Sequence, residues 1–328
     1  MKKCIVTGGA GFIGSNLVEK LINSNYKINI IDNLSTGLKS NLKTFEKKIN
    51  LYEKDISDIE QLDDIIFEDV DYIFHLAGLA DIVPSIENPE KYFKSNVLGT
   101  LNVLQKSKKH KVKKFIYAAS ASCYGIPRKF PITEKSEIIT EYPYALTKNL
   151  GEQMVMHWAK VYKIPYISLR FFNAYGQRSR TTGAYGAMFG VFLAQKLNKL
   201  PLTIVGDGSQ TRDFIHVNDL VDAVVKAAEH PIKNEIFNVA SGVETSVNTI
   251  ADIIGGKKIL IPKRPGEPDR SLADISKIKK LIGWKPQISI NEGVKMLLKD
   301  IEQWKNAPIW TPETIEKATR PWFQYLKK

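Results

Sequence analysis

Cysteine, long apolar runs and acidic charge are all scarce in this sequence of 328 residues. The two cysteines, Cys4 and Cys123, are too few for a disulfide framework and indicate a reducing compartment, so we expect a cytoplasmic protein. No stretch approaches the roughly 18 consecutive apolar residues of a membrane span. The chain opens directly into a strand-like segment rather than into a signal peptide, so we expect no membrane partner.

Basic residues outnumber acidic ones, 47 to 35, which gives a net charge of +12. Such an excess is typical of proteins that bind nucleic acid, and also of enzymes with small anionic substrates. The lysines are spread along the chain. The one dense cluster, 106–114 (KSKKHKVKK), falls where a helix should end and where cations are favourable. We therefore expect an anionic small molecule and no nucleic acid.

Short β-rich segments alternate with amphipathic helical ones in the first half of the chain. The strand candidates are CIVTGG, INIID, INLYEKD, YIFHLAG, KFIYAAS and YISLRFF. This alternation predicts an α/β fold with a Rossmann-type, doubly wound parallel sheet. After Asn173 the sequence is richer in loops, with one short strand (EIFNVA) and a helix (VNTIADIIG). We predict a cofactor-binding domain over 1–173 and a smaller C-terminal α/β part over 174–328 that mainly binds substrate.

A glycine-rich turn follows the first predicted strand and precedes a helix. Gly8, Gly11 and Gly14 allow a tight turn, close approach of the backbone to a pyrophosphate, and close packing of helix on strand. Asp32 ends the second predicted strand, 18 residues after Gly14. A carboxylate there accepts hydrogen bonds from ribose hydroxyls and repels a 2′-phosphate. The predicted cofactor is therefore NAD rather than NADP.

Tyr144 and Lys148 lie four residues apart in YALTK, on one face of a predicted helix. Tyrosine is an inert phenol near neutral pH unless a neighbouring cation stabilises its phenolate. A lysine one turn away supplies that charge and would make Tyr144 a general base. The strand end ASASCYG adds Ser120 and Ser122, whose hydroxyls either hold the reacting group or simply form a turn.

These features together resemble the extended short-chain dehydrogenase/reductase family. The segments that carry the resemblance are TGGAGFIGSN, HLAG, SASCYG and YALTK, extended by RFFNAYG, GDGSQTRDF and RPGEP, over about residues 3–290. Within that family the chain is similar to the UDP-glucose and UDP-N-acetylglucosamine 4-epimerases. The resemblance implies NAD as cofactor and a nucleotide-diphosphate sugar, with UDP favoured, as substrate. It also implies a homodimer formed through the helices around Val97 and Tyr144.

The resemblance further implies roles for individual residues. Tyr144 would be the acid/base, Lys148 would bind the nicotinamide ribose, and Ser120 with Ser122 would be the catalytic hydroxyls. The implied cofactor contacts are Gly8, Gly11, Phe12, Ile13, Gly14, Asp32, Asn33, Ser35, Thr36, Gly37, Asp55, Ile56, Leu76, Ala77, Gly78, Asn96, Tyr144, Lys148 and Phe171. The implied substrate contacts are Ser85, Ser120, Asn173, Met188, Phe189, Thr203, Ile204, Ser271 and, on the diphosphate, Arg212 and Arg264. A surface salt bridge is the alternative role for either arginine, and no metal site is expected.

The residues that follow Ser120 narrow the choice of reaction type. Dehydratases of the family carry carboxylates at the positions that Ala121 and Ser122 occupy here. The predicted activity is therefore an isomerase, a 4-epimerase that regenerates its NAD, and dehydration or decarboxylation on the same fold is the nearer alternative. A protein that only senses dinucleotide is the remoter one. Ser271 falls where glucose-restricted epimerases carry a bulky aromatic, which favours N-acetylated sugars unless it is merely a loop serine.

The segment from about residue 304 lies outside the resemblance. Thr311 as N-cap and Pro312 at the first helical position predict a short helix. Pro321 predicts the end of that helix before Trp322. We expect this segment to contribute packing rather than chemistry.

Overall fold

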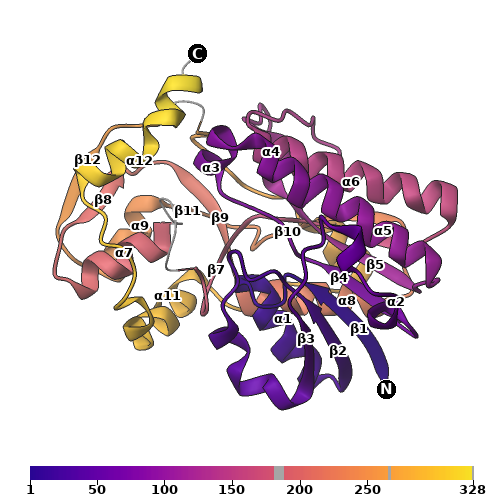
Figure 1. Ribbon diagram of the computed structural model, residues 1–328. Helices are drawn as coiled ribbons and strands as arrows, with labels where there is room; N and C mark the ends of the chain where they lie inside the picture. Colours follow the sequence, from indigo (N-terminus) through magenta and orange to yellow (C-terminus); the bar gives the residue numbers. More distant parts are fainter. Residues whose placement is uncertain (181–187, 265–266, 327–328) are drawn as a thin grey trace.

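The computed structural model describes residues 1–180, 188–264 and 267–326, and its centre is a seven-stranded parallel sheet (Figure 1). The strands lie in the order β10-β6-β5-β4-β1-β2-β3. Their bounds are β1 Lys2–Thr7, β2 Tyr26–Ile31, β3 Ile49–Tyr52, β4 Tyr72–His75, β5 Lys114–Ser120, β6 Tyr166–Phe171 and β10 Glu235–Val239. The Rossmann-type, doubly wound α/β fold is thereby confirmed.

Helices cover both faces of this sheet. On one face lie α1 (Phe12–Asn23) and α8 (Val217–Glu229), which pack on each other and on a core of β-strand side chains. On the other face lie α2 (Asp64–Phe67), α5 (Gly99–Lys109) and α6 (Pro143–Tyr162). The short helices α3 (Ile82–Glu87) and α4 (Pro89–Tyr92) and a π-helical turn (Phe93–Leu98) lead from β4 into α5. The strands are apolar on both faces because both faces are covered.

A smaller part is built around a separate core. It contains a three-stranded sheet in the order β11-β9-β7 and a parallel pair of β8 with β12. The bounds are β7 Asn173–Tyr175, β8 Leu202–Val205, β9 Thr211–His216, β11 Glu244–Ser246, β12 Lys258–Ile261, α7 Met188–Leu197, α9 Val247–Ile254 and α11 Ile290–Lys299. Helix α10 (Ser276–Ile282) packs instead on β10 of the large sheet, where Ile278 is buried. Phe192, Ile250 and Trp304 are among the side chains fully buried in this core.

The domain boundary predicted after residue 173 does not coincide with the division between the two cores, because a later segment returns to the large sheet. β10 pairs in parallel with β6, in a register that places Phe237 opposite Leu169, and so completes the large sheet from the second half of the chain. Lys114 at the start of β5 reinforces this return: its ammonium donates to the carbonyls of Ala228 at 3.0 Å and Ile232 at 3.0 Å. The apolar segment EIFNVA lies within the large sheet because the apolar side chains on both of its faces are buried there.

The lysine-rich segment 106–114 is held by acidic partners and carbonyls. Lys106, Lys109 and His110 all contact the carboxylate of Asp64. Lys113 forms an ion pair with Asp71 at 2.6 Å. Local partners and the end of α5 account for this cluster, as the helix-terminus interpretation predicts.

The C-terminal helix α12 (Pro312–Tyr325) begins where the sequence predicts, with Thr311 as its N-cap, but it does not end before Trp322. It continues through Pro321 because Trp322 is buried against the body, and the burial holds the last turn in place. The helix packs on α3 in the cofactor-binding half, beside which it lies in Figure 1. Among the described helices, none is both long and apolar enough to cross a membrane.

Candidate active site

A cavity of about 570 Å³ lies at the carboxyl ends of the parallel strands. The segments following β1, β2, β3, β4, β5 and β6 all contribute to its lining. Ligands of doubly wound folds bind at this edge of the sheet. The cavity is elongated from the glycine-rich turn, past Ser120 and Tyr144, to Arg180 and Phe189 near α7.

The glycine-rich turn forms a bare backbone floor at one end of the cavity. A Cβ atom on Gly14 would lie 2.0 Å from the carbonyl oxygen of Gly8, and one on Gly8 would lie 2.7 Å from the amide of Ala77. A Cβ on Gly11 would meet only the Gly8 oxygen, at 3.2 Å, and it faces the cavity. Side chains at Gly8 and Gly14 would collide with neighbouring backbone, so glycine keeps the turn tight against the start of α1. The bare backbone of this turn lines the cavity, and the residues present therefore fit the pyrophosphate of a dinucleotide.

Asp32 also stabilises the turn that it borders. Its carboxylate accepts hydrogen bonds from the backbone amides of Ala10 at 2.9 Å and Leu34 at 2.8 Å. Burial raises the pKa of Asp32, and these two amides oppose the rise. At the same end Asn33 donates to Asp55 at 2.9 Å, so the predicted adenosine contacts form one connected rim.

Most predicted cofactor contacts line the cavity. They are Gly8, Gly11, Phe12, Ile13, Gly14, Asp32, Asn33, Ser35, Thr36, Asp55, Ile56, Leu76, Ala77, Gly78, Tyr144, Lys148 and Phe171. Asn96 lies behind this wall, where it accepts from Leu79 N at 2.8 Å and donates to Thr147 Oγ1 at 3.0 Å. Gly37 also lies behind it, and a Cβ there would be 3.0 Å from the Asp32 carboxylate. Asn96 and Gly37 therefore pack against residues of the cavity lining and are not part of it.

Three hydroxyl groups meet where β5 ends. Ser122 Oγ donates to Ser120 Oγ at 2.8 Å, and both serines are close enough to the phenol of Tyr144 to act on its pKa. Burial raises the pKa of Tyr144, and the two serine hydroxyls oppose the rise. The loss of water around the phenol has the larger effect on this pKa, and the activation of Tyr144 by Lys148 stays a prediction. Further positive charge is needed to make Tyr144 a base near neutral pH.

Lys148 is buried one helical turn from Tyr144. Burial lowers the pKa of its ammonium from 10.5 to about 8, and the carboxylate of Glu152 opposes that fall. The Lys148 Nζ atom lies 4.6 Å from the centre of the Tyr117 ring. The ammonium thus carries its charge at neutral pH within an apolar and aromatic wall.

The sequence analysis missed an ion pair in the same cavity. Arg180 Nη2 contacts Asp81 Oδ2 at 2.7 Å, and both residues line the cavity. Burial raises the pKa of the nearby Tyr144, and the Asp81 carboxylate adds to that rise. No local pattern marks this pair, since 99 residues separate its members and both lie outside helices and strands.

The two predicted diphosphate arginines converge on one carboxylate. Arg212 Nη2 contacts Glu267 Oε1 at 2.8 Å, and Arg264 Nη1 lies 4.0 Å from Glu267 Oε2. Burial raises the pKa of Tyr142, and Glu267 adds to the rise, which shows that this cluster is near the ring that stacks on Tyr144. These contacts are the salt bridges that the sequence analysis gave as the alternative role for the two arginines. A carboxylate between two guanidinium groups also shows that this place suits an anion.

The remaining predicted substrate contacts are dispersed. Phe189 lines the cavity and stacks on Tyr175 at 4.6 Å, and Met188 begins the same helix, α7. Thr203 and Ile204 lie in the buried strand β8, where the Thr203 amide donates to Gln195 Oε1 at 3.1 Å. Of the predicted substrate contacts, Ser120 and Phe189 line the cavity, whereas Met188, Thr203, Ile204, Arg212 and Arg264 do not. The other three also lie outside the lining: Ser85 donates to Ile82 O, Asn173 to Asp213 O, and the amide of Ser271 to Thr211 O.

A dinucleotide cradle that opens onto a buried tyrosine and lysine defines the class, an NAD-dependent enzyme. The comparison with protein families gives the particular group. The model of the NAD dependent epimerase/dehydratase family matches residues 4–240, and the chain belongs to this family.

Individual relatives show the range of activities in the family. The chain is 40% identical to a putative UDP-glucose 4-epimerase of Methanocaldococcus jannaschii, over 90% of this chain and 96% of the relative. A UDP-N-acetylglucosamine 4-epimerase from Methanobrevibacter ruminantium M1, solved with UDP-N-acetylmuramic acid, is 33% identical with a TM-score of 0.85, over 91% of this chain and 99% of that one. The UDP-glucuronic acid decarboxylase 1 of Arabidopsis thaliana is 33% identical, over 91% of this chain and 69% of the relative.

Proposed function

We propose that the protein is an NAD-dependent 4-epimerase of UDP-hexoses or UDP-N-acetylhexosamines. The observation that carries the proposal is the hydroxyl cluster of Tyr144, Ser120 and Ser122, with Ala121 rather than a carboxylate in the turn. Elimination of water from C6 needs an additional acid and base at that turn. Inversion at C4 needs only one group that accepts and returns a proton.

In the proposed reaction Tyr144 accepts the O4 proton of the sugar while Ser120 holds the same oxygen by a hydrogen bond. NAD held in the cradle would supply the hydride acceptor and then the hydride donor at C4. The 4-keto sugar would turn in the cleft between the two transfers, so that cofactor and enzyme end as they began. Tyr144 returns its proton to O4. Lys148 supports the phenolate form of Tyr144 electrostatically, because its ammonium is charged below a pKa of about 8.

Two features support the identity of the substrate. Arg212 and Arg264 flank Glu267, and the same two guanidinium groups would hold a diphosphate by charge-assisted hydrogen bonds. The inclusion of N-acetylated sugars rests on the resemblance, which places a bulky aromatic at the position of Ser271 in glucose-restricted epimerases; Ser271 itself lies beside β9 and outside the cavity lining. The match to a decarboxylase favours UDP-hexuronate decarboxylation as the second candidate.

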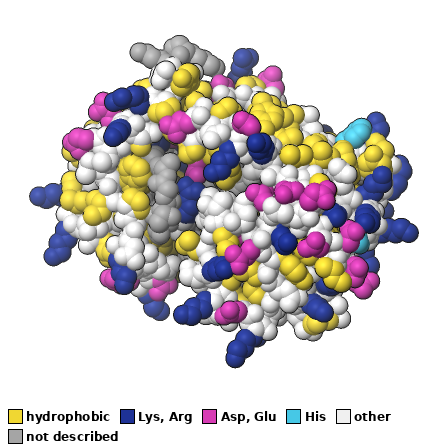
Figure 2. Space-filling model, in the orientation of Figure 1, with side chains coloured by type: hydrophobic (Ala, Val, Ile, Leu, Met, Phe, Trp, Pro, Cys, Tyr) yellow, Lys and Arg dark blue, Asp and Glu magenta, His cyan; other side chains and the backbone are white. Residues whose placement is uncertain are grey.

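The proposed assembly is a homodimer that pairs α5 and α6 with their copies. Large apolar side chains are exposed along this face, and Figure 2 shows hydrophobic side chains gathered over α6. They are Phe93, Leu98, Leu146, Met156, Val161 and Tyr162. An exposed apolar patch of this kind marks a contact surface.

The test is to incubate the purified protein, without added NAD, with UDP-N-acetylglucosamine, UDP-glucose and UDP-glucuronate separately, and to follow each by proton NMR. We expect the matching 4-epimer, approached to one fixed ratio from either side. A 4-keto-6-deoxy product or loss of the carboxyl group would replace the proposal with the dehydratase or decarboxylase alternative. Tyr144→Phe should retain NAD and lose turnover, whereas unchanged function in that variant would support a dinucleotide sensor.

A further inference from the structure

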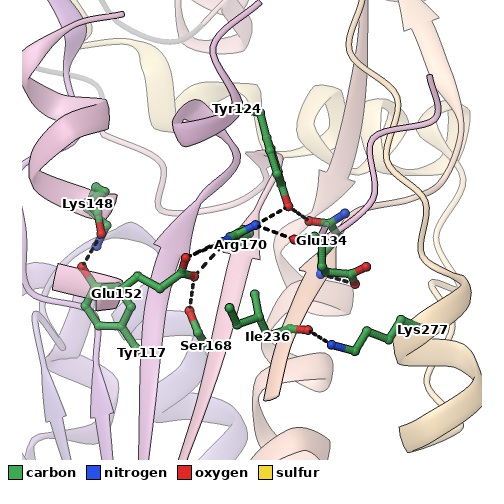
Figure 3. A network of polar contacts seen from close by, with 10 residues as sticks. Tyr117, Tyr124, Glu134, Lys148, Glu152, Ser168, Arg170, Ile236 and Lys277 are labelled. Carbon is green, nitrogen blue, oxygen red and sulfur yellow. Dashed lines mark hydrogen bonds and ion pairs between the residues drawn. The ribbon is translucent and has the colours of Figure 1, made fainter. Parts of the chain in front are cut away.

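A buried polar network includes the helix α6 that carries Lys148 (Figure 3). Its centre is Arg170 on β6, which is 4% exposed. The guanidinium contacts the Glu152 carboxylate with Nε at 3.2 and 3.1 Å and with Nη2 at 2.5 Å. Its remaining nitrogen, Nη1, donates to the phenol oxygen of Tyr124 at 2.8 Å and to the carbonyl of Glu134 at 3.2 Å.

One arm of the network reaches the helix that carries the predicted base. Glu152 lies on α6, four residues after Lys148 and eight after Tyr144, so all three lie on the same side of the helix. Ser168 Oγ donates to Glu152 Oε1 at 2.6 Å and adds a third partner to the carboxylate. Tyr117 reaches the same helix from β5, since its hydroxyl donates to the carbonyl of Lys148 at 3.1 Å.

The other arm reaches the turn that carries the serines. Tyr124 ends the 3-10 turn Ala121–Tyr124, which begins immediately after Ser120. Its hydroxyl accepts from Arg170 and donates to Asn238 Oδ1 at 2.7 Å. Arg170 therefore joins the helix of Tyr144 and Lys148 to the turn of Ser120 and Ser122 through a single planar group.

We infer that Glu152 and Arg170 are positioning residues: the ion pair holds Tyr144 and Lys148 in register with Ser120, and the Glu152 carboxylate keeps the Lys148 ammonium charged. The inference rests on the proposed function. A buried ion pair is a poor way to gain stability alone, because well-packed apolar residues of the same volume do as well or better. Its bidentate geometry fixes direction and distance, which a catalytic hydroxyl cluster requires.

The charge on Lys148 depends on the groups that face it. Glu152 lies on its own helix, His75 on β4, Tyr117 on β5, and Tyr144 one turn away. His75 is neutral because burial, with a contribution from Lys148, lowers its pKa to about 3. Burial raises the pKa of Tyr117 well above its usual value, so its phenol is neutral too. The carboxylate that opposes the effect of burial on the pKa of Lys148 is therefore that of Glu152.

The groups around Tyr144 complete the set. Burial raises the pKa values of Tyr92, Tyr142 and Cys123, so these three are uncharged near neutral pH. Asp81 faces Tyr144 from the segment after β4, where it is paired with Arg180. None of these groups replaces Glu152 beside Lys148.

The experiment compares wild-type protein with Glu152→Gln over a range of pH. We expect kcat to fall on the order of 10²-fold, the cost of a small misplacement of catalytic groups, with KM nearly unchanged. We also expect the alkaline limb of the kcat profile to move to lower pH, because the Lys148 ammonium loses its neighbouring anion. A folded, NAD-containing variant with wild-type kcat and profile would overturn the inference, as would a loss of activity without a shifted limb.

Tyr124→Phe tests the second arm alone. It removes the hydroxyl that joins Arg170 to the serine turn and leaves the ion pair and the ring in place. We expect a lower kcat with the alkaline limb unmoved, and an unchanged kcat would reject this arm. Asp219→Asn is the matched control, since it alters another buried carboxylate that accepts two backbone amides, at 3.0 and 2.8 Å, outside the cavity lining. It should lower stability without shifting the profile.

A readout that needs no turnover separates this inference from the proposed function. The pKa of Lys148 can be followed by NMR of protein labelled at the lysine ε-carbon, with the resonance assigned through Lys148→Arg. We expect a lower pKa in Glu152→Gln than in wild type. If the wild type shows no epimerisation, the proposed function fails, and the pKa comparison still decides whether Glu152 controls the charge on Lys148.

Discussion

The guanidinium carbon of Arg264 lies 5.5 Å from the centre of the Trp322 ring. The C-terminal helix α12 thereby contacts one of the two arginines proposed to hold the diphosphate. The same helix packs on α3 in the cofactor-binding half. On the proposed function, these two contacts give α12 a part in substrate binding that the sequence analysis did not assign.

Trp322→Ala should weaken substrate binding more than catalysis. Loss of the buried indole costs about 3–5 kcal/mol of unfolding free energy and removes one face of the Arg264 guanidinium. We expect a raised KM for the UDP-sugar and a smaller change in kcat, measured by steady-state kinetics below the lowered Tm. Tyr325→Ala, at a side chain 65% exposed on the same helix, is the control and should change neither. If Trp322→Ala lowers Tm and leaves KM unchanged, α12 contributes only to packing.

The pH dependence of kcat should show an alkaline limb near 8. Burial lowers the pKa of Lys148 from 10.5 to about 8, so its ammonium is present below that pH and is lost above it. Activity should therefore fall as pH rises through about 8, provided the fold is intact by circular dichroism. Lys148→Met should lower kcat at every pH and abolish the limb. A limb that persists in this variant would belong to another group.

Two alanine substitutions in the glycine-rich turn should differ in their effects. The new Cβ at Gly14 would lie 2.0 Å from a backbone oxygen, so Gly14→Ala should destabilise the fold and abolish NAD binding. The new Cβ at Gly11 meets the same oxygen at 3.2 Å and otherwise faces the cavity. Gly11→Ala should fold with a nearly normal Tm and retain less NAD, measured in the protein as purified. Equal NAD content in both variants would place the pyrophosphate elsewhere.

Arg180→Gln should change the preference between neutral and acidic sugars. Arg180 lines the cavity and is paired with Asp81, and a carboxylate on the sugar would compete for the same guanidinium. We expect the variant to lose kcat/KM for UDP-glucuronate on the order of tenfold more than for UDP-N-acetylglucosamine, a difference of about 1.4 kcal/mol. Arg178→Gln, whose guanidinium pairs with Glu19 on α1, is the comparison. Equal losses on both sugars would give Arg180 a structural role only.

Local patterns predicted the parts of the site that lie within one segment. The glycine-rich turn and the Tyr144–Lys148 spacing depend on neighbours a few residues away, and Asp32 is marked by its place at the end of the second predicted strand. The structure brings all of them to one cavity. Contacts between distant segments left no such pattern. Glu152 and Arg170 are 18 residues apart on different elements, so neither residue type nor spacing marks them as a pair.

Tertiary packing also overrode two local rules. A proline inside a helix usually breaks or kinks it, but burial of Trp322 holds α12 together beyond Pro321. Burial likewise changed the electrostatics of Tyr144, because the desolvation of its phenol outweighs the effect of the two serines. Burial is a property of the assembled fold, and a lysine four residues away does not reveal it.

The return of β10 to the large sheet has a consequence for how the protein is made. During synthesis the edge of β6 has no partner until residue 239 has left the ribosome, and an uncovered strand edge is prone to pair with other chains. We expect a fragment that stops at residue 173 to aggregate rather than bind NAD. One that continues through β10 and α10, to about residue 284, carries every strand of the cofactor-binding sheet.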